Sequence, residues 1–294
     1  MTGHHRADRT RAHHWARWHE CLTHAQVPSP AADLTALIQE VVGKPLYLVE
    51  SFTDAELQDL EAMVARRAGR EPLQHVLGKQ YFCGLELEAL PGVFCTRPET
   101  ELLVEAACDI ITAATGDTHA LPQPVRVLDL CSGSGAIALA LRHRLGPEQL
   151  AQVEAVEISE VAVASARRNA VRLQLAVNFT HGDATALPPS FEDGFSLVVS
   201  NPPYVPARQL DAEAGADPDL ALWGGGADGT EIPLAIARAA RRYLRPTGAF
   251  LMEHDETQGP ALVAGLRQLG YEDVRVHLDL NQRPRFLSAW IPRA

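Results

Sequence analysis

The chain has 294 residues, of which 46% are hydrophobic, and a formal net charge of −11. This length and composition favour a folded protein with a sizeable core, and no stretch is apolar over the roughly 18 residues of a membrane span. The acidic balance argues against tracking along naked nucleic acid, and five cysteines without a CxxC pair predict reduced thiols in the cytoplasm.

Residues 1–30 lack the apolar core of a signal peptide and predict a flexible or partly helical tail. The tail holds histidines, but no Cys partners follow at zinc spacing, so we expect no metal site. The histidines concerned are His4, His5, His13, His14 and His19.

Residues 31–78 predict a small helical domain, because their apolar residues recur at helical spacing. Thr53 begins a Thr-Asp-Ala-Glu run, the signature of a capping box. The cluster Arg66, Arg67 and Arg70 favours a solvated helix face, with contact to an acidic protein or an RNA surface as the alternative. Residues 79–96, interrupted by Gly84 and a Pro-Gly pair, predict a β-hairpin linker.

Residues 97–294 alternate short apolar runs with helical ones, which predicts a mainly parallel, doubly wound α/β sheet. The last two strands are close in sequence and should form a hairpin at one edge. Strands are expected at 125–130, 153–158, 177–182, 195–200, 248–253, 274–278 and 285–290. Helices are expected at 136–145, 161–173, 233–243 and 260–269.

The first of these strands runs into a glycine-rich segment, Asp129-Leu-Cys131-Ser132-Gly133-Ser134-Gly135. Glycines there allow a ligand to approach the backbone at a helix N-terminus. Glu157, which ends the next strand, can accept both hydroxyls of a ribose. These two signals fit NAD and S-adenosylmethionine equally well.

Three details favour S-adenosylmethionine. The carboxylate of Asp129 can attract an ammonium or sulfonium group, whereas it would repel a pyrophosphate. Asp183, followed by Ala184 after the third strand, can accept a hydrogen bond from an adenine amino group. The fourth strand leads directly into Asn201-Pro202-Pro203-Tyr204.

The segment Asn201-Pro202-Pro203-Tyr204 is suited to methylating a planar amide or amino nitrogen. The side-chain oxygen of Asn201 and the main-chain oxygen of Pro202 can accept both N–H groups of the substrate. Two prolines fix φ and preorganise these carbonyls. Tyr204 can stack on the planar group and exclude water.

With these motifs the chain resembles the release-factor glutamine methyltransferases of the HemK/PrmC type, over roughly residues 33–290. Residues 201–204 alone are shared with adenine-N6 and other amino methyltransferases, whereas the run Arg97-Pro-Glu-Thr-Glu101 is far more specific. Further matching segments are residues 69–78, 129–138 and 283–286.

The resemblance implies a class I, Rossmann-like, seven-stranded methyltransferase domain and an N-terminal domain that recognises a release factor. It also implies methylation of the glutamine side chain in a Gly-Gly-Gln loop. The implied cofactor site contains Asp129, Cys131, Ser132, Gly133, Ser134, Gly135, Glu157, Asp183, Ala184 and Asn201. The implied catalytic residues are Asn201, Pro202 and Tyr204, and the substrate site adds Pro203, Arg97 and Glu101.

Three features depart from the family pattern. Cys131 stands where glycine is common, and we interpret it as a small buried residue rather than a nucleophile. Glu253-His254-Asp255 replaces a commoner Glu-Ile-Gly. The glycine-rich loop at 223–229 is long and is either a flap beside the substrate or an inert surface loop.

Three other functions are weighed against the release-factor enzyme, for which we expect a monomer. A ribosomal-protein glutamine methyltransferase would share the chemistry but not the run at 97–101. An adenine methyltransferase would carry a basic recognition region, and none is visible. A non-catalytic cofactor-binding module would have no need of the acceptors at 201–204.

Overall fold

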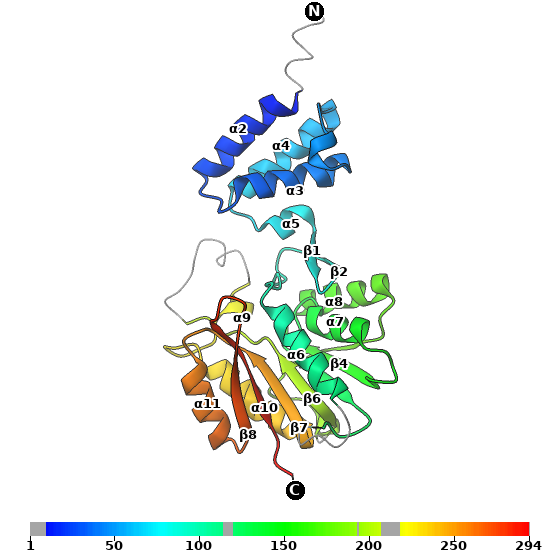
Figure 1. The fold of residues 1–294 in the computed structure, drawn as a ribbon, viewed down its shortest axis with the longest axis vertical. Helices are drawn as coiled ribbons and strands as arrows, with labels where there is room; N and C mark the ends of the chain where they lie inside the picture. Colours follow the sequence, from blue (N-terminus) through cyan, green and yellow to red (C-terminus); the bar gives the residue numbers. More distant parts are fainter. Residues whose placement is uncertain (1–9, 114–119, 193, 207–217, 294) are drawn as a thin grey trace, which may run out of the picture. The chain divides into compact units, whose positions relative to one another are not determined.

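The structure is a computed structural model that describes residues 10–113, 120–192, 194–206 and 218–293. The chain forms two compact units, the first ending at Lys79 and the second beginning at Gln80 (Figure 1). Among the helices of the described residues, none combines the length and apolar character needed to cross a membrane. The first nine residues, with His4 and His5, lie outside the described ranges.

The first unit is helical and has a core of its own. The predicted capping box at Thr53 is present, because the Thr53 hydroxyl accepts from the Glu56 N–H and the Glu56 carboxylate accepts from the Thr53 N–H. Trp18 and Leu22 of the first helix are buried in this core. The elements are α2 (Arg11–His24), α3 (Pro30–Val42), the 3-10 turn η1 (Leu46–Leu48), α4 (Asp54–Ala68) and α5 (Leu73–Leu77).

Helix α2 therefore begins well before residue 31, inside the segment expected to be a tail. The burial of Trp18 and Leu22 explains the difference, since an indole and a leucine at i and i+4 share one helix face. Most residues around Trp18 and Leu22 are polar, so the sequence pattern alone did not indicate a buried helix face.

Only one of the three arginines near the end of α4, Arg66, is exposed, so the expected solvated face is present only in part. Arg67 is buried and its Nε lies 2.7 Å from Oδ2 of Asp33. Arg66 pairs with Glu71 at 2.5 Å, and Arg70 donates to main-chain carbonyls after α2. All three side chains thus hold segments of the helical unit together.

The second unit opens with a hairpin of β1 (Lys79–Phe82) and β2 (Leu85–Glu88). Its apolar side chains join the core of this unit. Glu88 accepts hydrogen bonds from Ser165 and Arg168. The hairpin is therefore part of the second unit's packing as well as the connection that was expected.

Within the described residues, seven strands form one sheet in the order β5-β4-β3-β6-β7-β9-β8. Strands β3 to β7 are parallel, and β9 is antiparallel to both of its neighbours. The predicted edge hairpin is thus present. The strands are β3 (Arg126–Leu130), β4 (Gln152–Glu157), β5 (Asn178–His181), β6 (Phe195–Ser200), β7 (Leu244–Glu253), β8 (Glu272–Leu278) and β9 (Pro284–Trp290).

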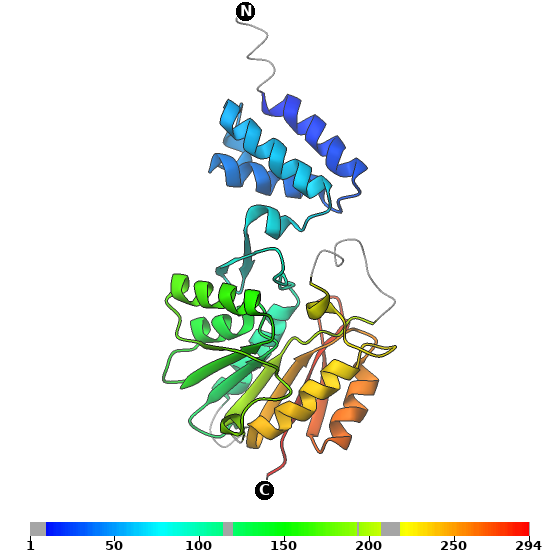
Figure 2. The same ribbon diagram turned by 180° about the vertical axis from the view of Figure 1, so that it is seen from behind.

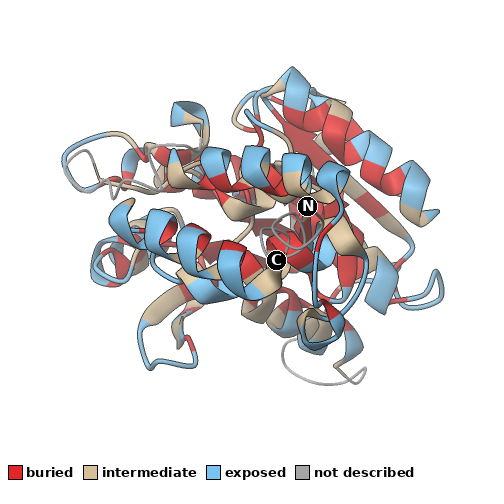
Figure 3. Ribbon diagram, turned by 90° about the horizontal axis from the view of Figure 1, so that it is seen from above, coloured by how far each residue is buried: buried red, intermediate tan, exposed pale blue. Residues whose placement is uncertain are grey.

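Helices cover both faces of the sheet (Figures 1 and 2). One core joins α6, α7 and α8 to one face, and a second joins α10 and α11 to the other. Figure 3 shows that the helices are buried on one side and exposed on the other. The helices are α6 (Thr100–Thr112), α7 (Ala136–Arg144), α8 (Glu160–Leu173), α9 (Asp219–Leu222), α10 (Glu231–Tyr243) and α11 (Gly259–Gln268), with a 3-10 turn η2 (Pro189–Phe191).

Candidate active site

The two main sequence motifs lie side by side at the carboxyl edge of the sheet. Strands β3 and β6 are parallel neighbours, and Leu130 stands in register with Ser200. Cys131 and Asn201 are therefore the first residues beyond adjacent strands. The Ser200 hydroxyl donates to the carbonyl of Leu130 at 2.8 Å, which ties the two strand ends together. Ligands of open α/β sheets bind at this edge.

The glycine loop turns through left-handed backbone at three positions: Cys131 at φ +62°, Gly133 at +54° and Gly135 at +80°. A side chain at Gly135 would come within 2.8 Å of Phe179, so the helix can approach the sheet only with glycine there. A Cβ at Gly133 would meet nothing within 4 Å, so the space beside the Gly133 backbone is open to a ligand. The φ of Cys131 explains why glycine suits that position.

Two buried polar atoms in this segment lack a protein partner. Asp129 is fully buried, and its Oδ2 accepts from the Ala138 N–H at 3.1 Å. Its Oδ1, like the hydroxyl of Ser132, has no hydrogen-bond partner within the described chain. Burial raises the pKa of Asp129 well above its usual value. A cationic ligand at Oδ1 would offset that cost, so this unpartnered acceptor fits an ammonium-bearing cofactor.

Glu157 ends β4 and contacts the glycine loop directly. Its Oε2 accepts from the Gly133 N–H and its Oε1 from the Ser159 N–H, both at 2.8 Å. Each carboxylate oxygen keeps further acceptor capacity for a ribose. Asp183 is exposed beyond β5, where its Oδ1 accepts from the N–H and hydroxyl of Thr185.

Ser134 and Ala184 make structural contacts at the same edge. The Ser134 hydroxyl lies 3.4 Å from Nε2 of Gln80, and its carbonyl accepts from Asn169 at 3.2 Å. The carbonyl of Ala184 accepts from the hydroxyl of Tyr243 at 3.1 Å. These hydrogen bonds do not test the predicted contacts of Ser134 and Ala184 with the cofactor, which stay predictions.

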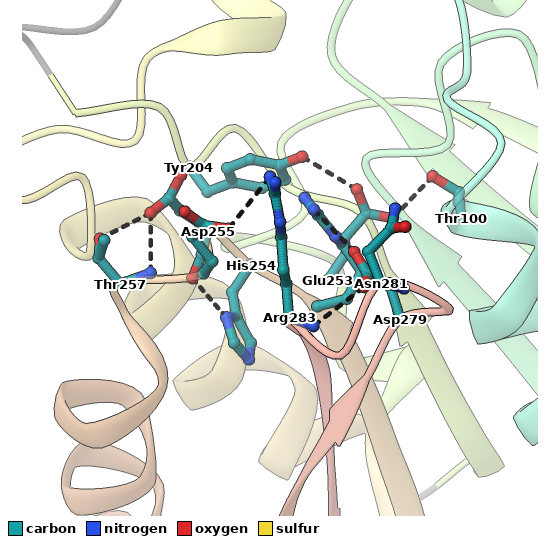
Figure 4. A network of polar contacts seen from close by, with 11 residues as sticks. Thr100, Tyr204, Glu253, His254, Asp255, Thr257, Asp279, Asn281 and Arg283 are labelled. Atoms are coloured by element: carbon teal, nitrogen blue, oxygen red, sulfur yellow. Dashed lines mark hydrogen bonds and ion pairs between the residues drawn. The ribbon is translucent and has the colours of Figure 1, made fainter.

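A buried carboxylate organises the segment at 201–204 (Figure 4). Glu253, the last residue of β7, is 1% exposed. Its Oε1 accepts from the Tyr204 hydroxyl at 2.9 Å and its Oε2 from the Thr100 hydroxyl at 2.6 Å. The Thr100 oxygen lies 3.3 Å from Nδ2 of Asn201. Burial raises the pKa of Glu253, and burial together with Glu253 raises that of Tyr204.

The main chain of Tyr204 is fixed as well. The buried side chain of Gln258 donates from Nε2 to the carbonyls of Tyr204 and Asp228, each at 2.7 Å. A Cβ at Gly229 would come within 2.3 Å of the Tyr204 carbonyl oxygen, and one at Gly224 within 2.7 Å of Tyr204 Cα. The 223–229 loop therefore packs against the Tyr204 backbone at both of these glycines and is not an inert surface loop.

Arg97 and Glu101 flank the start of α6. Glu101 accepts from the Cys83 N–H at 2.7 Å and so fastens the hairpin turn to the helix. The guanidinium of Arg97 lies over the ring of Phe94, 5.3 Å from its centroid. Their expected part in closing the substrate pocket stays a prediction.

Thr100, Glu253 and Gln258 were missed in the sequence. Thr100 lies inside the 97–101 run, of which only the charged residues Arg97 and Glu101 were assigned to the site. Glu253 had a usable signal, because an acidic residue ending a buried parallel strand lies at the ligand-binding edge. His254 is buried behind it, with Nδ1 2.7 Å from the carbonyl of Asp255. In the described ranges, no cluster of three or more His, Cys, Asp or Glu could hold a metal ion.

Known methyltransferases resemble this chain over most of its length. A methyltransferase domain model matches residues 123–272, and the model of the PrmC N-terminal domain matches residues 14–78. The release factor glutamine methyltransferase of Streptomyces coelicolor is 40% identical over 277 residues, covering 91% of this chain and 93% of that protein. That of Bifidobacterium longum is 38% identical over 288 residues, covering 91% and 95%.

The chain belongs to the release factor glutamine methyltransferase family. S-adenosylmethionine is accordingly its methyl donor, and the predicted family, fold class and cofactor are confirmed. A crystal structure of a methyltransferase from Pyrococcus furiosus is also similar, with a TM-score of 0.51 and 19% identity over 71% of this chain and 90% of that one. This second likeness bears on the fold alone.

Proposed function

We propose that this family member transfers a methyl group from S-adenosylmethionine to the side-chain amide nitrogen of the glutamine in the Gly-Gly-Gln motif of peptide chain release factors. It does so as a cytoplasmic monomer, and its helical first unit recognises the release factor. The similar proteins of Streptomyces coelicolor and Bifidobacterium longum are release factor glutamine methyltransferases, which supports the substrate class. The observation that carries the chemistry is the position of Asn201 beside the glycine loop, directly after the neighbouring strand.

An amide nitrogen is a weak nucleophile, because its lone pair is delocalised into the carbonyl. Asn201 has its Nδ2 engaged by Thr100, while no described residue donates to its Oδ1. That oxygen and the Pro202 carbonyl can accept the two N–H groups of a glutamine amide. Accepting them out of plane favours localisation of the lone pair on nitrogen.

Tyr204 does not act as a base. The pKa of its hydroxyl is raised well above the usual value by burial and by Glu253, so it stays protonated, and it donates to Glu253. Its ring, partly buried beside the turn, is available to cover the planar amide and exclude water. Catalysis therefore depends on alignment and preorganised acceptors.

When bound, S-adenosylmethionine supplies an electrophilic methyl group on a positively charged sulfur. We assign its cationic end to Oδ1 of Asp129, with the cofactor lying against the backbone of Gly133 and Gly135. Glu157 would accept from the ribose and Asp183 from the adenine amino group. The unpartnered Oδ1 of Asp129 and the open space beside the Gly133 backbone support this assignment.

The test compares wild type with Asn201→Ala, using methyl-labelled S-adenosylmethionine and a purified release factor. We expect transfer to fall by about 100-fold, the effect of removing one preorganised catalytic hydrogen bond. Cofactor affinity, measured by calorimetry, should fall far less than the rate of transfer, because Asp129 and Glu157 remain. A variant that methylates at the normal rate would show that Asn201 is not the acceptor.

A wild-type protein that binds cofactor but leaves release factors unmodified would refute the proposed substrate. Ribosomal-protein glutamines and then adenines would be tried next with the same assay.

A further inference from the structure

Glu253 contacts Tyr204 directly and is linked to Asn201 through Thr100, and hydrogen-bond polarity makes this arrangement directional. An ionised carboxylate can only accept hydrogen bonds. One oxygen of Glu253 receives the hydroxyl of Thr100 and the other the hydroxyl of Tyr204. A single buried side chain therefore fixes the direction of both hydroxyl groups.

The hydroxyl of Thr100 has one proton, and at 2.6 Å that proton is given to Glu253. Its contact with Asn201 at 3.3 Å can then only be one in which the threonine oxygen accepts. The amide of Asn201 must turn its NH₂ group toward Thr100. Its Oδ1 is left pointing away from Thr100, as an acceptor.

We propose that Glu253 and Thr100 form a positioning relay that fixes the Asn201 amide with its oxygen toward the substrate. This inference rests on the proposed function, because the acceptor it orients is the one that receives the glutamine N–H. Without the relay, the amide could turn over and present NH₂, which would repel the substrate amide. Neither Glu253 nor Thr100 needs to touch the substrate.

The charge of Glu253 matters to this relay. A protonated Glu253 could donate to Thr100, which could then donate to Asn201 and reverse the amide. The charged and titratable groups facing Glu253 are Tyr204 beyond β6, Arg285 of β9 and Glu99 before α6. Burial raises the pKa of Glu253, so the relay is intact above that pKa and is lost as the pH falls through it.

Three single variants test the relay. Glu253→Gln keeps the shape but adds a donor, and Thr100→Val keeps the shape but removes the hydroxyl. Each should lower kcat about tenfold, the effect of one ordinary hydrogen bond, with KM for the release factor and cofactor affinity unchanged. Thr100→Ser should recover most of the rate lost in Thr100→Val.

Because the two residues act as one unit, the double variant should be no slower than the slower single variant. The fall of kcat at low pH that we expect of wild type should be absent in Glu253→Gln. Effects that multiply in the double variant, or a Glu253→Gln enzyme that is folded and within twofold of wild type, would overturn the relay.

A substrate-free measurement separates the relay from the proposed function. In NMR spectra of the whole chain, hydrogen exchange of the Asn201 side-chain NH₂ should be slow in wild type. It should speed up at least tenfold in Thr100→Val and Glu253→Gln. Unchanged exchange contradicts the relay even if release factors are methylated, whereas the expected change supports it even if they are not.

Discussion

Gly224 offers a sharp test of whether the 223–229 loop holds the catalytic turn in place. A methyl group at this position would lie 2.0 Å from the Gly229 carbonyl oxygen and 2.7 Å from Tyr204 Cα. Both neighbours are backbone atoms, so no side-chain rotation can relieve the clash. Cβ contacts below 3.0 Å essentially never occur, so the loop or the turn must move by at least about 1 Å.

Overpacking of this kind costs about 1–3 kcal/mol, which corresponds to a fall in Tm of about 2–12 °C for a unit of this size. A displacement of about 1 Å at the catalytic turn can lower kcat about 100-fold. We therefore expect Gly224→Ala to lose far more rate than stability, with cofactor affinity retained. Thermal unfolding, calorimetry and the labelled-methyl assay measure the three quantities.

Gly146→Ala is the matched control, because an added methyl there meets nothing within 4 Å and the backbone is not left-handed. It should behave as wild type in all three assays. If Gly224→Ala is as active as Gly146→Ala, the loop does not position Tyr204 and this account of the 223–229 segment is refuted.

Three further variants or treatments test other parts of the structure. Arg67→Ala should lower the free energy of unfolding by about 3–5 kcal/mol in urea titration, because it leaves Asp33 buried and unpaired, and a smaller loss than 1 kcal/mol would contradict the buried pair. Iodoacetamide at pH 8 should alkylate the exposed Cys21 much faster than Cys131, whose pKa is raised by burial; equal labelling in peptide mass spectrometry would show that Cys131 is accessible as thiolate. Cofactor binding should release protons and become tighter as the pH rises, because a cation beside Asp129 lowers the pKa that burial has raised. Calorimetry in buffers of different ionisation enthalpy should detect the released protons. Loss of this proton release in Asp129→Asn would identify Asp129 as the group that titrates, and its persistence would contradict the assignment.

The parts of the fold with a clear period could be predicted from the sequence. Continuous apolar runs and the glycines after the first strand marked the parallel sheet and its ligand-binding edge. Residues 1–30 were expected to be a flexible or partly helical tail, and the packing of α2 into a core was not foreseen, because only a short apolar stripe that includes Trp18 and Leu22 interrupts a polar stretch. The arginines at the end of α4 looked solvated, since nothing in the sequence reveals that Asp33 lies beside Arg67.

The candidate site shows the same limit. Asn201 and the glycine loop each belong to a short motif, and the local sequence of each motif indicates its chemistry. Glu253 and Thr100 are 153 positions apart, and only the pairing of β7 with β6 and the packing of α6 bring them to Asn201. The position of Glu253 at the end of a strand could have marked it as a site residue, but its pairing with Thr100 depends on tertiary structure and has no local signal in the sequence.

The most direct test of the central claim is mass spectrometry of a purified release factor after incubation with this protein and S-adenosylmethionine. The account predicts one added methyl group, placed by peptide fragmentation on the glutamine of the Gly-Gly-Gln motif and absent with Asn201→Ala. A methyl group on any other residue, or no methyl group with cofactor binding intact, would contradict it.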